Sequence, residues 1–271
     1  MFEIENGVAS SMTPHEAFEL ETQARINALT HDESIHALSK TWVEELLRRN
    51  YTYNFRWLGR PIIQLPQDAL ALQELIWRVK PDLIVETGIA HGGSLILSAS
   101  LLTLIECCEA IQLEGVFDPR SARRRVLGVD IEIRPHNRQA LAAHPLSHCI
   151  ELIEGSSVAP EVVARVKAYA RGFQRIFVCL DSNHCEAHVL AELEAYTPLV
   201  SKGSYCVVLD TVIEDLPDSL FSNRPWGRAN NPKTAVRRFL RNTDRFVIDA
   251  EMENKLLATC APNGFLKCVK D

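Results

Sequence analysis

Short apolar runs alternate with longer periodic stretches from Gln67 almost to the end of the chain. A short apolar run bounded by turn residues is typical of a buried strand, and a longer periodic stretch is typical of a helix. Repeated strand–helix units predict an α/β fold with a mostly parallel sheet and right-handed crossovers. The predicted strands are Asp82–Glu86, Val126–Ile131, Cys149–Glu154, Arg175–Leu180, Ser204–Leu209, Phe246–Asp249 and Phe265–Val269. The predicted helices are Gln67–Val79, Ser94–Ile111, Asn137–Ala143, Pro160–Ala170, Glu186–Leu199 and Pro232–Asn242.

The two ends of the chain depart from this alternation. The last two predicted strands follow one another without a helix signal between them, which predicts a C-terminal antiparallel hairpin at a mixed sheet edge. Residues 1–50 have a polar, helical pattern and predict an N-terminal arm or cap. Residues 51–66 (YTYNFRWLGRPIIQLP) are aromatic and broken by prolines, so they form either a fixed domain edge or a lid over a site. We therefore expect an arm and lid segment over 1–66 and a Rossmann-like catalytic domain over 67–271.

Composition narrows the choice of partners and compartment. The 271 residues are 46% hydrophobic and 24% charged, which is ordinary for a globular protein, and the formal net charge of −6 argues against a nucleic-acid partner. No continuous apolar run of about 18 residues predicts a transmembrane helix, and the start MFEIENGVASS lacks the basic region of a signal peptide. Eight cysteines without CxxC pairs indicate reduced thiols in the cytoplasm and argue against a zinc site.

Candidate chemistry begins at DLIVETGIAHGGS, residues 82–94. A buried strand ends at Glu86, and Gly88 and Gly92 let the backbone turn sharply before a helix that opens at Ser94. This order is typical of a nucleotide cradle at the carboxyl end of a strand. A carboxylate stands where a pyrophosphate would need room, so the pattern favours a cationic ligand such as S-adenosylmethionine. His91, within the turn, could contact the carboxylate of that donor; the alternative is a plain strand–turn–helix corner.

Acids end four of the predicted strands, at Glu86, Asp130, Asp181 and Asp210. The carboxyl ends of parallel strands line one crevice, which is the usual ligand site of an open α/β sheet. Asp130 is in position to accept hydrogen bonds from both ribose hydroxyls of a nucleoside. The alternative for any single acid is helix N-capping. Ser156 and Ser157 follow the strand that ends at residue 154. We expect these two serines to lie beside an adenine ring.

Asp181 and Asp210 end neighbouring strands and could share a divalent cation such as Mg²⁺, with Thr211 adding a hydroxyl. A cation there would lower the pKa of a substrate hydroxyl. His184, three residues after Asp181, could act as general base and take the proton of that hydroxyl. The alternative for His184 is a solvent-facing residue at a helix start.

With these motifs the chain resembles the cephalosporin hydroxylase / rhamnosyl O-methyltransferase-like family of S-adenosylmethionine-dependent enzymes. The matching stretches run from about Tyr53 to the C-terminus: YNFRWLGRPIIQLPQDALALQELIW, VETGIAHGGSLILSAS, LDSNHCEAHVLAELEAYTPLVSKGSYCVVLDT, PWGRANNPKTAVRRFL and ENKLLATCAPNGFLK. The resemblance implies a class I methyltransferase fold. Gln64, in the first stretch, and Asp181 join the expected cofactor-binding residues.

The arrangement of acids is also similar to that of catechol O-methyltransferase, in which a lysine follows the first metal-binding acid by three residues; here that position is His184. Family members often carry a Glu before the acid of the fifth strand, where this chain has Leu209, so one carboxylate ligand is missing.

Together these features predict a Mg²⁺-assisted O-methyltransferase acting on a hydroxyl of a sugar, a glycosylated natural product or a similar small polar acceptor. Two alternatives remain open from the sequence: a metal-dependent oxygenase and a non-catalytic adenosyl-ligand-binding protein. No two-His-one-carboxylate spacing supports the oxygenase. We expect no nucleic-acid or membrane partner, and a homo-oligomer stays open.

Overall fold

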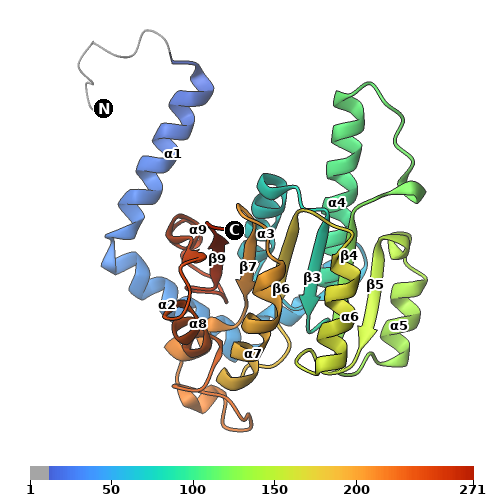
Figure 1. Ribbon diagram of the computed structural model, residues 1–271. Helices are drawn as coiled ribbons and strands as arrows, with labels where there is room; N and C mark the ends of the chain where they lie inside the picture. The colour runs from blue at the N-terminus through green and yellow to red at the C-terminus, as the bar shows by residue number, and fades with distance from the viewer. Residues whose placement is uncertain (1–11) are drawn as a thin grey trace.

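A computed structural model describes residues 12–271 and contains a seven-stranded sheet. Helices cover both faces of this sheet (Figure 1). The strand order is β5-β4-β3-β6-β7-β9-β8. The first five of these strands are parallel, and β9 runs antiparallel to both β7 and β8. The predicted α/β architecture is therefore confirmed. The strands are β3 (Leu83–Thr87), β4 (Arg125–Asp130), β5 (Ile150–Glu154), β6 (Ile176–Leu180), β7 (Tyr205–Val208), β8 (Phe246–Ile248) and β9 (Phe265–Cys268).

The central strands are buried on both faces, which explains why they read as continuous apolar runs. One face packs against α3 (Pro66–Val79), α4 (Gly93–Gln112) and α5 (Pro135–Ala142), through side chains such as Leu75 and Ile96. The other face packs against α6 (Pro160–Ala170), α7 (Glu186–Tyr196) and α8 (Pro232–Leu240).

The strand order reverses direction at β3. The chain moves outward from β3 to β4 and β5, then returns to place β6 on the other side of β3. In register, Thr87 lies beside Val129 of β4 and Leu180 of β6, so the loops that follow these three strands leave the sheet at one edge. A crevice at such a reversal is the common ligand site of open α/β sheets.

The C-terminal hairpin is present but differs from the prediction in one respect. Strands β8 and β9 pair antiparallel as expected, with Phe246 opposite Cys268. A helix, α9 (Ala250–Leu256), connects them, and Asp249 caps it by accepting a hydrogen bond from the Met252 N–H. The expectation of a connection without a helix was wrong because seven residues are too few to give a clear helical period.

The N-terminal part contains two helices, α1 (Pro14–Thr30) and α2 (Glu33–Arg48), which confirms the predicted helical pattern for residues 14–48. Thr13 and Asp32 cap them through hydrogen bonds to the first turns. Figure 1 shows α1 projecting away from the sheet. The first eleven residues of the predicted arm lie outside the described part of the chain, and the division of the chain at residue 66 stays a prediction.

The aromatic segment after α2 is an ordered hairpin rather than an irregular loop. A short 3₁₀ turn (Tyr51–Asn54) leads into β1 (Phe55–Trp57) and β2 (Arg60–Ile62), which pair antiparallel. The Trp57 indole N–H donates to Ser100 Oγ in α4 at 3.0 Å. A Cβ on Gly93 would collide with the carbonyl of Pro61, so β2 lies directly against the first turn of α4.

Helix α4 is the one helix within residues 12–271 that is long and apolar enough to cross a membrane, judged by length and composition. The sequence interpretation, which looked for an uninterrupted apolar run, did not anticipate this. Half of the apolar stretch is buried inside the protein, where Leu95, Ile96 and Leu102 pack in the core beside the sheet. A core helix in contact with both strands and neighbouring helices needs this composition.

Candidate active site

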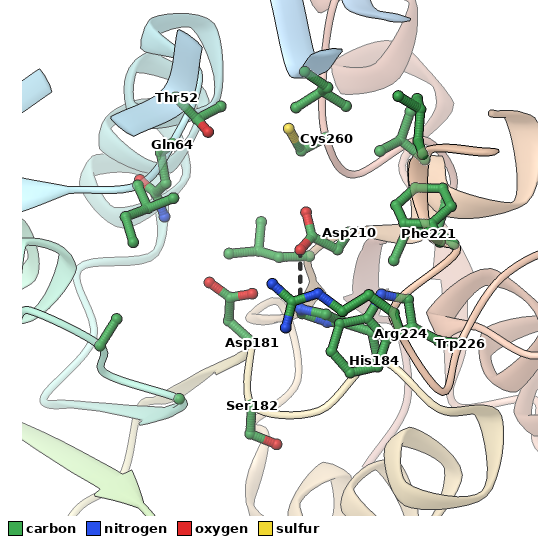
Figure 2. A pocket seen from close by; sticks show the side chains of 18 of the residues that line it. Thr52, Gln64, Asp181, Ser182, His184, Asp210, Phe221, Arg224, Trp226 and Cys260 are labelled. Atoms are coloured by element: carbon green, nitrogen blue, oxygen red, sulfur yellow. Dashed lines mark ion pairs between the residues drawn. The ribbon is translucent and has the colours of Figure 1, made fainter. Parts of the chain in front are cut away.

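A cavity of about 390 Å³ opens at the carboxyl edge of the parallel strands. Residues from the ends of four neighbouring strands reach it: Gly88 after β3, Asp130 at the end of β4, Asp181 after β6 and Asp210 after β7. The opposite walls come from the segment after α2 and from the long loop after β7 (Figure 2). The strand-end acids predicted from the sequence therefore converge on one cavity, with the exception of Glu86.

The turn after β3 is shaped by its first glycine and by Asp130. Gly88 has a φ of +80°, and a Cβ there would collide with the backbone of Asp181 and Ser182. The turn after β3 is therefore in direct contact with the loop after β6. Asp130 Oδ2 accepts hydrogen bonds from the N–H groups of Ile89 at 2.8 Å and Ala90 at 3.3 Å. Asp130 thus holds the turn in place while its carboxylate also lines the cavity.

Glu86 lies behind this turn and does not line the cavity. Its side chain is buried and accepts a hydrogen bond from Ser94 Oγ. Burial raises the pKa of Glu86 to about 7, the Ser94 hydrogen bond lowers it, and the Asp130 carboxylate raises it further. The carboxylate therefore has no cation beside it within the described residues, which is an unfavourable place for a charge unless a cationic group arrives with a ligand.

The remaining residues of the glycine turn support it from outside the cavity. Gly92 has a φ of +78° and abuts Leu141, and it immediately precedes α4. The His91 carbonyl accepts two hydrogen bonds from the Arg60 guanidinium, at 3.1 and 2.6 Å. Neither these residues nor Ser94 lines the cavity, so a direct contact of any of them with a cofactor stays a prediction.

Ser156 and Ser157 are also outside the cavity wall. Ser157 is buried, its Oγ lies 3.0 Å from His188 Nε2, and its carbonyl accepts a hydrogen bond from the Tyr196 hydroxyl. This network ties the loop after β5 to α7. Any contact of these serines with an adenine ring stays a prediction.

Three predicted residues form a compact cluster in the middle of the cavity. Asp181, His184 and Asp210 offer ligand atoms that all lie within 4.8 Å of one another, and His184 Nε2 is 3.1 Å from Asp210 Oδ2 (Figure 2). Burial and the neighbouring Asp210 carboxylate raise the pKa of Asp181 well above its usual value, with smaller contributions from more distant acids. A divalent cation would relieve this repulsion, and carboxylate oxygens with an imidazole nitrogen suit such an ion, so these residues fit a metal site.

The structure shows Thr211 hydrogen-bonded to a neighbouring loop. Thr211 is fully buried, does not line the cavity, and donates its hydroxyl hydrogen to the Pro262 carbonyl at 2.7 Å. This hydrogen bond uses the hydroxyl hydrogen to hold the loop at Pro262, and a contact of Thr211 with a metal ion stays a prediction. Because Leu209 is apolar, the cluster consists of two carboxylates and one imidazole.

Gln64 does line the cavity, as the sequence interpretation expected. Its side chain is largely buried, and its Oε1 has no hydrogen-bond partner in the structure. A buried carbonyl oxygen without a partner is unfavourable, and a ligand that donates a hydrogen bond would satisfy it. The orphaned oxygen therefore favours a polar ligand at this wall.

Sequence reasoning missed the function of Asp68. Its buried carboxylate accepts hydrogen bonds from Thr259 Oγ1 and from the Cys260 N–H, and Cys260 lines the cavity. Burial raises the pKa of Asp68 to about 6, the hydrogen bonds lower it, and the Asp210 carboxylate raises it. A contact between residues so far apart in the sequence left no local signal.

The aromatic wall beside His184 was also missed. The Trp226 ring stands edge-on to the His184 ring, with centroids 4.8 Å apart and an interplanar angle of 86°. Tyr53 and Phe221 line the same cavity. The available signal was PWGRANN, a stretch in which an isolated Trp is surrounded by turn-forming residues.

Comparison with known proteins supports one family. The model of the family described as rhamnosyl O-methyltransferase/CmcI matches residues 49–269. A rhamnosyl O-methyltransferase of Mycobacterium bovis (strain BCG / Pasteur 1173P2) is 30% identical over 196 residues, covering 72% of this chain and 70% of the relative. That of Mycobacterium leprae (strain TN) is 27% identical over 224 residues, covering 80% and 85%.

A solved structure supports the same fold. The structure described as cmcI-D160 Mg-SAM superimposes with a TM-score of 0.52 at 16% identity, covering 80% of this chain and 78% of that one. The Rossmann-like methyltransferase fold expected from the resemblance is thereby confirmed. From the extent of the family match and the identity to the mycobacterial enzymes, the chain belongs to the rhamnosyl O-methyltransferase/CmcI family of methyltransferases.

Proposed function

We propose that this protein transfers the methyl group of S-adenosylmethionine to a hydroxyl of a sugar or glycosylated natural product, assisted by Mg²⁺. The observation that carries the proposal is a single cavity with two groups of residues. Gly88 and Asp130 lie on one side of it, and the cluster of Asp181, His184 and Asp210 lies beside them. A methyltransferase needs a donor site and a hydroxyl-activating site within reach of one another. The mycobacterial relatives are named for O-methylation of a rhamnosyl group, which supports a sugar as the acceptor.

The residues on the β3–β4 side of the cavity would hold the donor. Asp130 accepts hydrogen bonds from ribose hydroxyls, and Gly88 lets the ligand approach the backbone closely. Glu86, from behind the turn, favours the cationic methionine portion, because its buried carboxylate is otherwise without a cation. Gln64 Oε1 accepts a hydrogen bond from the donor. When bound, S-adenosylmethionine supplies a methyl group that its own sulfonium already activates.

The acceptor hydroxyl is activated on the β6–β7 side. Asp181 and Asp210 would hold the Mg²⁺, which when bound supplies positive charge that makes a nearby hydroxyl more acidic. His184 accepts the hydroxyl proton on a ring nitrogen as general base. Asp210, within 3.1 Å of His184 Nε2, and the edge-on indole of Trp226 fix the orientation of the imidazole. Catalysis is then mostly positioning and charge stabilisation.

The cluster composition disfavours the oxygenase alternative. Asp181, His184 and Asp210 provide one imidazole and two carboxylates, whereas non-haem iron oxygenases use two histidines and one carboxylate. A non-catalytic adenosyl-binding protein would have no use for a general base beside a metal site.

Methyl transfer from labelled donor to a panel of rhamnosides and other glycosides tests the proposal. We expect label in at least one glycoside, and loss of that label in Asp210→Asn with donor affinity little changed. Donor binding without transfer to any glycoside would favour the non-catalytic alternative, and absence of donor binding would contradict the proposal.

A further inference from the structure

The cavity extends beyond the cluster to a wall that the proposed chemistry does not use. This wall comes from the end of α2 and from the loop after β7, and most of its side chains are apolar: Leu47, Leu216, Leu220 and Phe221. Arg224 is the exception. Among the described residues that line the cavity, it is the one arginine or lysine. We propose that Arg224 binds an anionic group, a phosphate or a carboxylate, on the methyl acceptor, so that the preferred acceptor is an anionic glycoside. The proposal rests on the proposed function.

Arg224 stands close to the reacting end of the cavity. Its guanidinium carbon lies 5.3 Å from the centroid of the Trp226 ring, and the same ring is 4.8 Å from that of His184. The guanidinium and the imidazole of the general base therefore both lie against the same indole ring. Figure 2 shows the Arg224 side chain pointing into the cavity. An acceptor whose hydroxyl reaches His184 and the aspartates can extend a second polar group to Arg224.

The neighbouring arginines are engaged, whereas Arg224 is not. Arg228 donates through Nε to the Leu216 carbonyl at 3.0 Å, Arg237 pairs with Glu214, and Arg238 pairs with Glu186. Arg224 forms no ion pair with any carboxylate in residues 12–271, although the cavity also contains Asp181 and Asp210. The N–H groups of its guanidinium are therefore free to donate hydrogen bonds. Their planar arrangement matches two oxygens of a phosphate or carboxylate.

The loop that presents Arg224 is held in place by several hydrogen bonds. The Pro225 carbonyl accepts from Asn230 Nδ2 at 2.9 Å and from Cys185 Sγ at 3.7 Å. Asn230 Oδ1 in turn accepts from the Glu186 N–H at 3.0 Å, at the start of α7. The loop is thus fastened to the segment that directly follows His184, which reduces the entropy lost when a ligand is bound.

This geometry also explains the PWGRANN stretch of the sequence. Trp226 provides a ring that both His184 and Arg224 contact. Asn230 links the loop to α7, and Asn231 caps α8 while donating to the Gly227 carbonyl at 2.8 Å. The stretch builds a wall whose charge is opposite to that of the cluster. Because the carboxylates around the cluster repel anions, an anionic acceptor needs a cation such as Arg224.

Calorimetry with paired ligands tests the inference without requiring turnover. The ligands are glucose 1-phosphate, methyl glucuronide and methyl glucoside, which carry a phosphate, a carboxylate and no charge. Each is titrated into metal-free protein saturated with S-adenosylhomocysteine, so that the phosphate cannot bind through Mg²⁺. The variants are Arg224→Met and, as a matched control, Arg241→Met. Arg241 is exposed at the end of α8 and does not line the cavity.

We expect wild-type protein and Arg241→Met to bind at least one anionic ligand about tenfold more tightly than methyl glucoside, and Arg224→Met to lose that difference. Which anionic ligand binds tells phosphate from carboxylate. Arg224→Lys should keep part of the preference, because a lysine retains the positive charge but lacks the planar pair of N–H donors. Equal or absent binding of all three ligands to the wild type, or a preference that survives in Arg224→Met, would overturn the inference. Failure of S-adenosylhomocysteine itself to bind would instead contradict the proposed function.

Discussion

Glu86 holds a carboxylate in the core with a hydroxyl, but no cation, as its hydrogen-bond partner. Its pKa of about 7 in the folded chain lies above its ordinary value of 4.5, so the folded state binds a proton that the unfolded state has released. The stability that protonated Glu86 contributes is therefore present below about pH 4.5 and is lost as pH rises through about 7. The loss has an upper bound of about 3 kcal/mol.

We predict that Glu86→Gln stabilises the ligand-free protein relative to wild type, by an amount that grows between about pH 5 and pH 8. Urea denaturation at both pH values measures this difference. Asp68, whose pKa is also raised, is present in both proteins and cancels in the comparison. The same variant should bind S-adenosylmethionine more weakly at about pH 8, because the neutral amide cannot favour the cationic donor. A stability difference that does not change with pH would show that Glu86 is charged throughout this range.

Asp130 should contribute to donor affinity through its charge and through the turn that it holds. Its Oδ2 accepts from the Ile89 and Ala90 N–H groups and its carboxylate lines the cavity. We predict that Asp130→Ala weakens S-adenosylmethionine binding by about 1–3 kcal/mol, measured by calorimetry. Glu132→Ala, a nearby exposed acid outside the cavity, serves as the control and should bind normally. Unchanged affinity in Asp130→Ala would remove Asp130 from the donor site.

His184 should control the rate of methyl transfer and should have little effect on the affinity for S-adenosylmethionine. We predict that His184→Ala lowers the rate of methyl transfer by roughly 10²–10⁴-fold, the usual contribution of a general base. His136→Ala, an exposed histidine on α5, provides a matched control. If His184→Ala kept the wild-type rate, the cation that Asp181 and Asp210 would hold must activate the hydroxyl without a general base.

At the scale of elements, the sequence allowed the sheet edge to be predicted but not the walls of the cavity. Parallel strands place their carboxyl ends together, so Asp130, Asp181 and Asp210 could be brought into one site from their positions alone. The walls depend on long-range contacts and short elements, which leave little periodicity. The three-residue strands β1 and β2 and the loop that carries Trp226 are examples.

The aromatic segment, residues 51–66, combines features of the two roles that the sequence left open, a fixed domain edge and a lid over a site. Its hairpin is fixed to α4 by the Trp57–Ser100 hydrogen bond and by the contact of Pro61 with Gly93. The flanking residues Thr52, Tyr53 and Gln64 line the cavity. A fixed edge and a ligand-facing wall are therefore combined in one segment.

We predict that donor binding slows amide hydrogen exchange at residues 50–54 and 63–65, and leaves exchange in β1 and β2 unchanged. Exclusion of water by these residues would protect the donor and strengthen charge interactions in the cavity. Exchange mass spectrometry with and without S-adenosylhomocysteine makes the comparison. Identical exchange at all of these residues would identify the whole segment as a fixed edge of the core.

The whole molecule joins this sheet domain to a projecting helix. Helix α1 extends away from the sheet (Figure 1), and its exposed side chains include Phe18 and Leu20. A homo-oligomer, left open by the sequence, stays a prediction. The polar pattern of residues 14–30 allowed the helix to be predicted, but its direction depends on contacts that no local pattern encodes.

The central claim is that one cavity joins a donor site to a metal-assisted hydroxyl site. In this account Asp181 and Asp210 would hold the cation, His184 stands beside them as the general base, and Asp130 belongs to the donor side. If this is correct, the cation should serve transfer and not donor binding.

The most direct test measures the initial rate of labelled-methyl transfer to an accepted glycoside across a Mg²⁺ titration, after exhaustive chelation. We predict that the rate falls to background in the chelated protein, returns as Mg²⁺ is added, and fails to return in Asp210→Asn at the same concentrations. A wild-type rate that persists after chelation would contradict the account.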